Sequence, residues 1–550
     1  MSSTNKTLLS KKKGTQMQKA ALLTIGVFAL YFLMFIPHIN MPATIYESDN
    51  MIGALVMKNG ALLYDGYPSQ HPPLMYFFCY LLTLFGVKGF IGFRVGTYCL
   101  LSGFFTFAWL RYKKWYGAIP CLIFPALFIS SLSLQSELYS VTTDLLHMMG
   151  LVLLLLEFLH YLKTKELSRR SSIALGISVI LMLGSAMVSG FVLFTTLLSV
   201  LIIEASDAQA KKRTFKEFIL HLFTKFKLLF GIIIGALLVF LLYLVLTGTL
   251  DDAYQGIWVI NREIYPKYND NKYGSSILEA FILPFLFFFT SLFDSVTSIG
   301  DQAFSSLMVA SYFIGNICFI FYVFLKNKLH GLMIFVFIVM SMARYNIAGG
   351  WHMIPYYAVS CFTLLYPAVK AFQSRNKYRE ALPAVSIFPL IASLLICNSY
   401  IVQMPANLNR DINDTYTTAG STGAIINAIT TPEDRILVCD VRVDLYIGTG
   451  HLPAAPYGGI SAWMTEKYGQ KGLEDFAHNQ PKVVIYNSTL APRGYSQQEY
   501  AADYVEYIEA NYTPFNDALD STVYVRNDYY YEAHRLYSSS TSDYQDMGYR

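Results

Sequence analysis

The feature that most constrains this chain is a series of apolar segments, each nearly as long as a helix that crosses a bilayer. A spanning helix needs about 20 mainly apolar residues. With 54% apolar and only 14% charged residues over 550 positions, the chain holds far more apolar sequence than one soluble core needs. We therefore predict a polytopic α-helical membrane protein. The segments, about 13 in number, lie near residues 20–37, 72–86, 90–110, 117–134, 141–162, 172–185, 187–204, 227–247, 277–295, 304–325, 330–347, 352–371 and 383–402.

The positive charges between these segments predict which of them cross. Short cytoplasmic loops carry an excess of Lys and Arg, so the basic run at 11–13 places the N-terminus in the cytoplasm. The clusters at 111–114 and 163–170 fall on that side only if 72–86 lies along the outer interface, and the same test indicates that 277–295 does not fully cross. We expect about eleven spans plus two interfacial or re-entrant helices.

The last quarter of the chain differs in charge and in pattern. From Val402 onward, 10 Lys and Arg stand against 19 Asp and Glu, a net charge of −9, whereas the remainder carries +13. RILVCD and KVVIYN are typical of buried parallel strands, TVYVRN of a third strand, and QQEYAADYVEYIEANY of a helix. We expect a cytoplasmic tail at 1–18, a membrane domain at 19–404 with its first outer loop at 39–89, an extracytoplasmic α/β domain at 405–528, and a flexible tail at 529–550.

Acids and cations gather on the predicted outer side. Glu47 and Asp49 follow the first span, and His71 precedes a double proline. Asp144 stands just inside an apolar segment, where an ionisable group is costly and by default functional. Each has a plainer alternative: a solvated helix start for the two acids, structural pairing for Asp144, snorkelling for arginines and ordinary interface histidines. The remaining candidates on this side are Arg94, Glu137, Arg344 and His352.

The order of these motifs resembles the GT-C superfamily of glycosyltransferases, especially the protein mannosyltransferase-like and aminoarabinose transferase-like enzymes. Two departures are visible. Ser48 separates two acids that are adjacent in many relatives, and His71 stands where the aminoarabinose-type enzymes have Lys. The matching residues are Glu47, Asp49, Asn59 with Gly60, Tyr64, His71 with Pro72, Arg94, Thr143 with Asp144, and His352 with Pro355; the segment 433–457 resembles the outer domain of some members.

The resemblance implies transfer of a sugar from a polyprenyl-phosphate donor to a glycan, lipid or protein acceptor at the outer surface. An acceptor hydroxyl must lose a proton as it attacks, which a carboxylate base promotes, and a single displacement inverts the anomeric centre. Cations stabilise the departing phosphate. Accordingly, Glu47 or Asp49 is the expected base, Glu137 and Asp144 are supporting acids on one face if helical, and the expected phosphate ligands are His71, Arg94, Arg344 and His352.

The resemblance implies no cofactor, and nothing points to nucleic acid. Glu47, Asp49 and Asp144 could make an oxygen site for a divalent cation, as in the oligosaccharide-transferring branch of the superfamily, but the nearer-looking relatives generally work without metal, so we expect none. Only Cys439 lies in the outer domain, so that domain needs no internal disulfide, which favours a bacterial cell membrane. The main alternative is a transporter or flippase of lipid-linked sugars, although such proteins place polar groups near the midplane of inverted repeats, and no repeat is visible here. A non-catalytic scaffold leaves Asp144 without purpose. The tyrosine-rich outer domain is also a candidate to stack on acceptor sugars.

Overall fold

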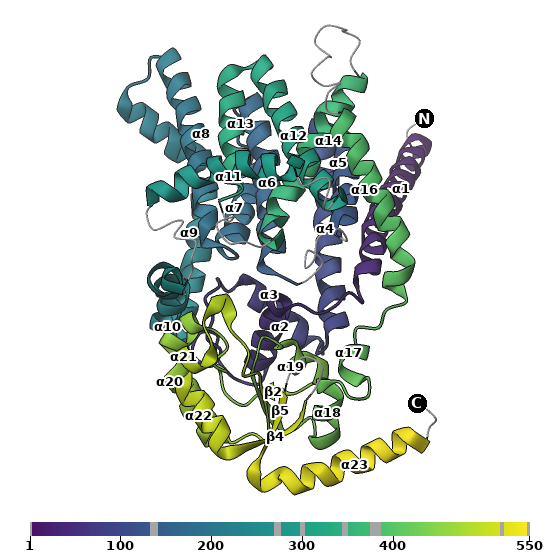
Figure 1. Cartoon of the computed structure of the whole chain (residues 1–550). Coiled ribbons are helices and arrows are strands. Elements are labelled where there is room, and N and C mark those ends of the chain that lie inside the picture. The colour runs from purple at the N-terminus through teal and green to yellow at the C-terminus, as the bar shows by residue number, and fades with distance from the viewer. Residues whose placement is uncertain are drawn as a thin grey trace.

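The computed structural model describes residues 3–132, 141–268, 277–297, 303–343, 350–373, 387–517 and 522–546. A bundle of long helices forms one layer, and a domain with a small sheet lies beneath one end of it (Figure 1). Helices α2 (Ile45–Lys58) and α3 (Leu74–Leu84) lie between the two layers. The segment predicted to be the first outer loop is therefore enclosed by the bundle on one side and the C-terminal domain on the other.

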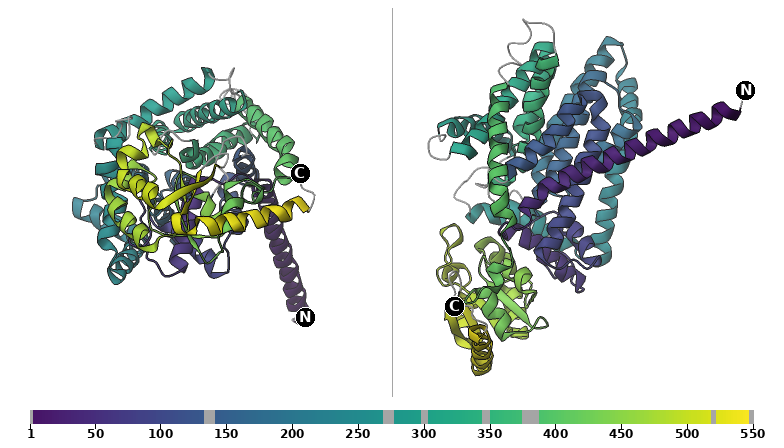
Figure 2. Two further views of the ribbon diagram at one scale, coloured as in Figure 1. Left: turned by 60° about the horizontal axis from the view of Figure 1, so that its bottom comes forward. Right: turned by 90° about the vertical axis from the view of Figure 1, so that its right-hand side faces the viewer.

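Seven helices of the described chain are long and apolar enough to cross a membrane, so this is a multi-pass membrane protein. The first of them projects away from the bundle at its N-terminal end (Figure 2). The candidates are α1 (Ser3–Phe35) with η1 (Ile36–His38), α4 (Phe90–Tyr116), α6 (Thr143–Thr164), α8 (Gly190–Ala210) after η3 (Met187–Ser189), α9 (Phe215–Thr247), α12 (Ala303–Lys326) and α16 (Ile387–Leu408).

Shorter helices account for much of the difference from the eleven expected spans. At a rise of about 1.5 Å per residue, the 14 residues of α5 and the 13 of α13 fall short of a hydrocarbon core of about 30 Å. Helix α3, with 11 residues, is also too short to cross, in line with the interfacial placement expected for 72–86. The other helices of this layer are α5 (Ala118–Ser131), α7 (Arg169–Leu183), α10 (Leu250–Tyr254), η4 (Gln255–Ile264), η5 (Tyr265–Tyr268), α11 (Ile277–Thr297), α13 (Lys328–Met340), η7 (Gly350–Met353) and α14 (Ile354–Gln373).

Helix α6 lies at the centre of the bundle, and 89% of its apolar window is buried. Leu, Met and Val residues all round its circumference suit such a position. Its close approach to α7 requires Gly150, because a Cβ there would lie 2.6 Å from Met182 Cγ and 2.8 Å from Ser178 O. Ser178 Oγ in turn donates a hydrogen bond of 2.7 Å to the Gly150 carbonyl. The two helices are therefore held in register by packing and by a buried polar contact.

The end of α6 that is remote from the C-terminal domain carries charged clusters. Arg111 Nε donates to Glu157 Oε1 at 2.7 Å, and Lys225 Nζ lies 2.6 Å from Glu204 Oε1 and 2.8 Å from the Lys165 carbonyl. The 22 residues of α6 span about 33 Å, close to the thickness of a hydrocarbon core. The basic end of the bundle and the start of α6 are thus about one membrane thickness apart.

The C-terminal domain is a five-stranded mixed sheet in the order β2-β1-β3-β5-β4 with helices packed around it. The three strands expected from the sequence are confirmed: β1 pairs parallel with β3, with Leu437 opposite Val484, and β3 pairs antiparallel with β5. The predicted helix near 497–512 is also present, in two pieces. The elements are α17 (Asp414–Thr417), α18 (Thr422–Ile429), β1 (Arg435–Cys439), α19 (Asp444–Thr449), β2 (Leu452–Pro453), α20 (Ala462–Asn479), β3 (Val483–Tyr486), η8 (Pro492–Gly494), α21 (Gln497–Tyr500), α22 (Ala502–Asn511), β4 (Tyr512–Asp517), β5 (Thr522–Arg526) and η9 (Asn527–Tyr529).

The chain end differs from the flexible tail that its composition predicted for 529–550. Residues Tyr530–Asp546 form helix α23, which runs beneath the sheet domain. The physical reason is aromatic packing: the ring of Phe515 meets Tyr530 and Tyr537 edge-on, with centroids 6.1 and 5.7 Å apart, and Ala533 is fully buried. These contacts stabilise a helix that its own polar composition does not favour.

Candidate active site

The two acids of the first outer loop lie in the first turns of α2 and diverge from there. Thr44 caps the helix: its side chain accepts the Glu47 N–H at 3.3 Å, and Glu47 Oε1 accepts the Thr44 N–H at 3.0 Å. Residues two apart on a helix do not share a face. Glu47 therefore points toward α4, whereas Asp49 points toward the loop between α2 and α3. The one intervening residue, Ser48, thus places the two carboxylates on different faces of the helix.

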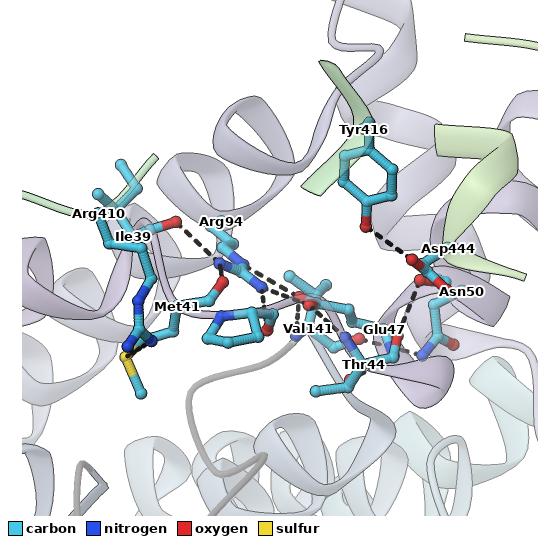
Figure 3. A network of polar contacts seen from close by, with 12 residues as sticks. Ile39, Met41, Thr44, Glu47, Asn50, Arg94, Val141, Arg410, Tyr416 and Asp444 are labelled. Atoms are coloured by element: carbon cyan, nitrogen blue, oxygen red, sulfur yellow. Dashed lines mark hydrogen bonds and ion pairs between the residues drawn. The ribbon is translucent and has the colours of Figure 1, made fainter. Parts of the chain in front are cut away.

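Glu47 is fully buried in an ion pair with Arg94 of α4 (Figure 3). Arg94 Nε donates to Glu47 Oε2 at 3.1 Å and its Nη2 donates to Oε1, a bidentate arrangement. The same guanidinium donates to the carbonyls of Ile39, Met41 and Pro42 at 2.8, 2.6 and 3.2 Å. This geometry differs from the expected roles, because it turns Arg94 toward Glu47 and backbone rather than toward a donor phosphate.

Helix α2 also positions the start of α6. Glu47 Oε2 accepts the Val141 N–H at 3.4 Å, and Asn50 Nδ2 donates to the Val141 carbonyl at 3.1 Å (Figure 3). Thr142 is extended, so α6 begins at Thr143 and presents Asp144 in its first turn. A single helix therefore does not connect Asp144 with Glu137, and Glu137 itself lies outside the described residues. The buried pair thus supports Asp144 through the backbone.

Asp49 is held by two tyrosines instead of a cation. Tyr67 OH donates to Oδ1 at 2.7 Å, and Tyr76 OH donates to Oδ2. Gly53, one turn further along α2, makes room for both rings, because a Cβ there would lie 2.7 Å from Tyr76 Cδ1 and 2.9 Å from Tyr67 Cε1. Removal from water raises the pKa of Asp49 above its ordinary value, although both hydrogen bonds lower it. Asp49 is consequently a stronger base than a solvated aspartate.

Asp144 and His352 meet from positions 208 residues apart in the membrane domain. His352 Nδ1–H donates to Asp144 Oδ2 at 3.1 Å, and the two side chains are 8% and 2% exposed. The N-terminus of α6 stabilises the Asp144 carboxylate. A carboxylate on one ring nitrogen fixes the orientation of an imidazole, so Asp144 orients the His352 ring.

These groups surround one small pocket of about 20 Å³ at the bundle end that faces the C-terminal domain. It is lined by Tyr46, Asp49, Asn50, His71, Thr142, Thr143, Asp144 and His352. Four of the predicted site residues, taken from three distant parts of the chain, therefore come together: Asp49, His71, Asp144 and His352. Arg344 falls at 344–349, outside the described residues.

A second cavity of about 310 Å³ adjoins the first and shares Tyr46, Asp49 and His71 with it. Its far wall belongs to the C-terminal domain and includes Tyr446 and Trp463. Sequence reasoning had not identified Tyr67, Tyr76 or Trp463 as site residues, because single aromatic residues in a chain with 16% aromatics carry no spacing signal. Within the part of the chain that the structure describes, no three His, Cys, Asp or Glu side chains are grouped as a metal site.

No family model matches the chain, and no curated protein is similar to it in sequence. Among solved structures, it is similar to ArnT from Cupriavidus metallidurans bound to undecaprenyl phosphate, with 13% identity, 92% of this chain and 98% of that chain covered, and a TM-score of 0.46. It is also similar to the Archaeoglobus fulgidus oligosaccharyltransferase in complex with Zn and sulfate, with 13% identity, coverage of 91% and 73%, and a TM-score of 0.37.

Proposed function

We propose that this protein is a membrane glycosyltransferase that moves a sugar from a polyprenyl-phosphate donor to an acceptor at the outer face of the membrane. The observation that carries the proposal is the place of Asp49 between two adjoining pockets. One pocket holds His71, Asp144 and His352, and the other extends to the C-terminal domain. An inverting displacement needs a base on the acceptor side and charge stabilisation on the leaving-group side.

Asp49 is the proposed base, and Glu47 is assigned a positioning role. Glu47 has both carboxylate oxygens paired with Arg94 and is fully buried. Asp49 lines both pockets, and its hydrogen-bond donors are neutral tyrosines. A raised pKa makes a carboxylate better matched to accept a proton from an attacking hydroxyl near neutral pH.

The proposed ligands of the donor phosphate are His71 and His352, with Asp144 orienting His352. A protonated imidazole places positive charge and N–H donors beside the oxygen that gains charge as the sugar leaves. Loss of the Asp144 contact at 3.1 Å would release the ring from this orientation. A phosphate group is larger than the pocket of about 20 Å³, so donor binding requires its walls to separate.

The charges at the two ends of α6 support an outer location of the site. Lys163 and Lys165 lie at its C-terminal end, and Asp144 lies about 30 Å away at its start. Because positive charge marks the cytoplasmic side, the pockets belong to the extracytoplasmic face, with the C-terminal domain. A polyprenyl carrier keeps its tail in the bilayer and presents its phosphate at this surface.

The proposal is tested with purified protein in nanodiscs, supplied with radiolabelled polyprenyl-phosphate sugars and a cell-envelope glycan fraction. We expect release of polyprenyl phosphate together with label transfer to the acceptor, and loss of both in Asp49→Asn. A flippase would instead move intact label between the leaflets of a proteoliposome. If the labelled donor moves between the leaflets without being cleaved, and does so at equal rates in wild type and Asp49→Asn, the proposed glycosyltransferase activity is rejected.

The tyrosine contacts of Asp49 predict a shift in the pH dependence of transfer. Tyr76→Phe removes a hydrogen bond that favours the charged carboxylate, so the pKa of Asp49 rises further. The base is active when deprotonated, so activity falls as pH drops through this pKa, and the acidic limb of kcat/KM moves to higher pH. One hydrogen bond predicts a move of about 0.5–1 pH unit. Tyr80→Phe, on the same helix, is the control; an unmoved limb or one at lower pH contradicts the assignment.

A further inference from the structure

In the part of the chain that the structure describes, the larger cavity lacks the Lys and Arg side chains that would be expected at a site for phosphate-linked donors. It is built by the first outer loop and the C-terminal domain together, and of the described residues that line it none is Lys or Arg. Arg493 lies 5.5 Å from the Trp463 ring but is not among the lining residues. Asp49 is the carboxylate in the lining. His71 also lines the cavity, at the edge that it shares with the smaller pocket, and the proposed function assigns it to the donor phosphate. A phosphorylated or carboxylated acceptor would therefore enter beside the Asp49 carboxylate without a cation of its own, which is unfavourable.

Aromatic rings supply much of the remaining surface. They come from both sides of the cavity, and they are Tyr46, Tyr67, Tyr446, Tyr457 and Trp463. Large rings offer apolar faces with a polar edge, which suits a sugar ring, whose C–H face is apolar and whose rim carries hydroxyls. The volume of about 310 Å³ is at the lower end of small-molecule sites, which run from about 300 Å³ to about 1,000 Å³. One or two sugar rings fit such a space.

Two of the lining residues carry buried polar atoms without a hydrogen-bond partner among the described residues: the Trp463 Nε1–H donor and the Gln70 Oε1 acceptor. Unpaired buried polar groups are rare and costly. The hydroxyls of two other lining residues already have hydrogen-bond partners within the protein. Tyr446 OH accepts the Val438 N–H at 2.8 Å, and Tyr457 OH donates to the Ser461 carbonyl at 2.8 Å. Both atoms are themselves buried, so ligand hydroxyls would pair with Trp463 and Gln70 only if these side chains turn toward the cavity.

We propose that this cavity is the acceptor subsite and that it selects an uncharged sugar residue, with Trp463 as the specificity-determining residue. The inference rests on the proposed function and deepens it, because Asp49 faces the same cavity and would take the proton of the bound hydroxyl. The C-terminal domain accordingly supplies the acceptor wall of the site. A lipid tail does not suit this place, because the wall lies in the domain beyond the helix bundle (Figure 1).

Binding is measured apart from turnover, by saturation-transfer NMR on the full-length protein in nanodiscs with a panel of neutral methyl glycosides and with glucose 6-phosphate. At least one neutral glycoside is expected to bind, and glucose 6-phosphate is expected not to. Trp463→Ala should weaken that binding at least tenfold, and Trp463→Phe, which keeps a ring but loses the N–H, should fall between. Trp258→Ala is the matched control, since Trp258 is 48% exposed and lines neither of the two cavities beside Asp49.

Two outcomes overturn the acceptor subsite: no glycoside binding that depends on Trp463, or glucose 6-phosphate binding that depends on it equally. Either result leaves the proposed function standing if Asp49→Asn still abolishes polyprenyl phosphate release. Conversely, an active Asp49→Asn rejects the function while glycoside binding is unaffected. In turnover, Trp463→Ala should raise the acceptor KM about tenfold with kcat within about threefold, which a general loss of structure would not produce.

Discussion

Asp49→Asn is expected to lower the kcat of sugar transfer by about 10²–10⁴-fold, the usual contribution of a positioned general base. The amide keeps the size of the side chain and accepts one of the two tyrosine hydrogen bonds, so the fold is retained. The measurement is single-turnover transfer in nanodiscs with saturating donor. Donor binding should be unchanged, because the lost group acts on the acceptor hydroxyl.

The matched control is Asp65→Asn, a second carboxylate of the same outer loop. Asp65 is 49% exposed and pairs with Lys471 of α20 at 2.6 Å, and exposed pairs contribute only about 0–1 kcal/mol. Its loss should leave kcat nearly unchanged. An Asp49→Asn variant as active as the Asp65→Asn variant would remove Asp49 from the mechanism.

Arg94→Met is expected to cost about 3–5 kcal/mol in the free energy of unfolding, because it leaves the Glu47 carboxylate buried without its partner. Three backbone carbonyls lose their donors at the same time. The measurement is chemical denaturation in mild detergent, with exposed Arg262→Met as the control. Glu47→Met should be similarly harmful, whereas the double variant should cost less than the sum, because no charge is left buried.

The same variants separate a positioning role from phosphate binding. If Arg94 were a donor ligand, as the motif order predicted, Arg94→Met would weaken donor binding and leave the free energy of unfolding largely intact. The bidentate contact with Glu47 and full burial predict the reverse. Arg94→Lys should also destabilise, because an ammonium group does not reproduce the forked geometry.

Much of the site was predictable from residue chemistry alone. Asp144 is a carboxylate at the start of an apolar segment, where an ionisable group is costly without a partner. The structure pairs it with His352, 208 positions away. Asp49 and His71 were recognised because ionisable groups at the end of a span are conspicuous in so apolar a chain. The three strands around RILVCD, KVVIYN and TVYVRN were also predictable, since short continuous apolar runs have few other uses. The helix at Tyr530–Asp546 was not, because its stability comes from contacts with Phe515.

The sequence by itself determined that this chain enters a membrane, that an acidic α/β domain follows, and that acids and histidines lie at span ends, because burial of apolar segments and exclusion of charge are local consequences of residue type. Only the tertiary structure decided the surroundings of each acid. Glu47 and Asp49 leave one helix in different directions, and partners far apart in the chain, Arg94 for one and Tyr67 with Tyr76 for the other, set their environments. The far wall of the cavity, more than 350 residues later, exists only because the C-terminal domain folds back over the first loop.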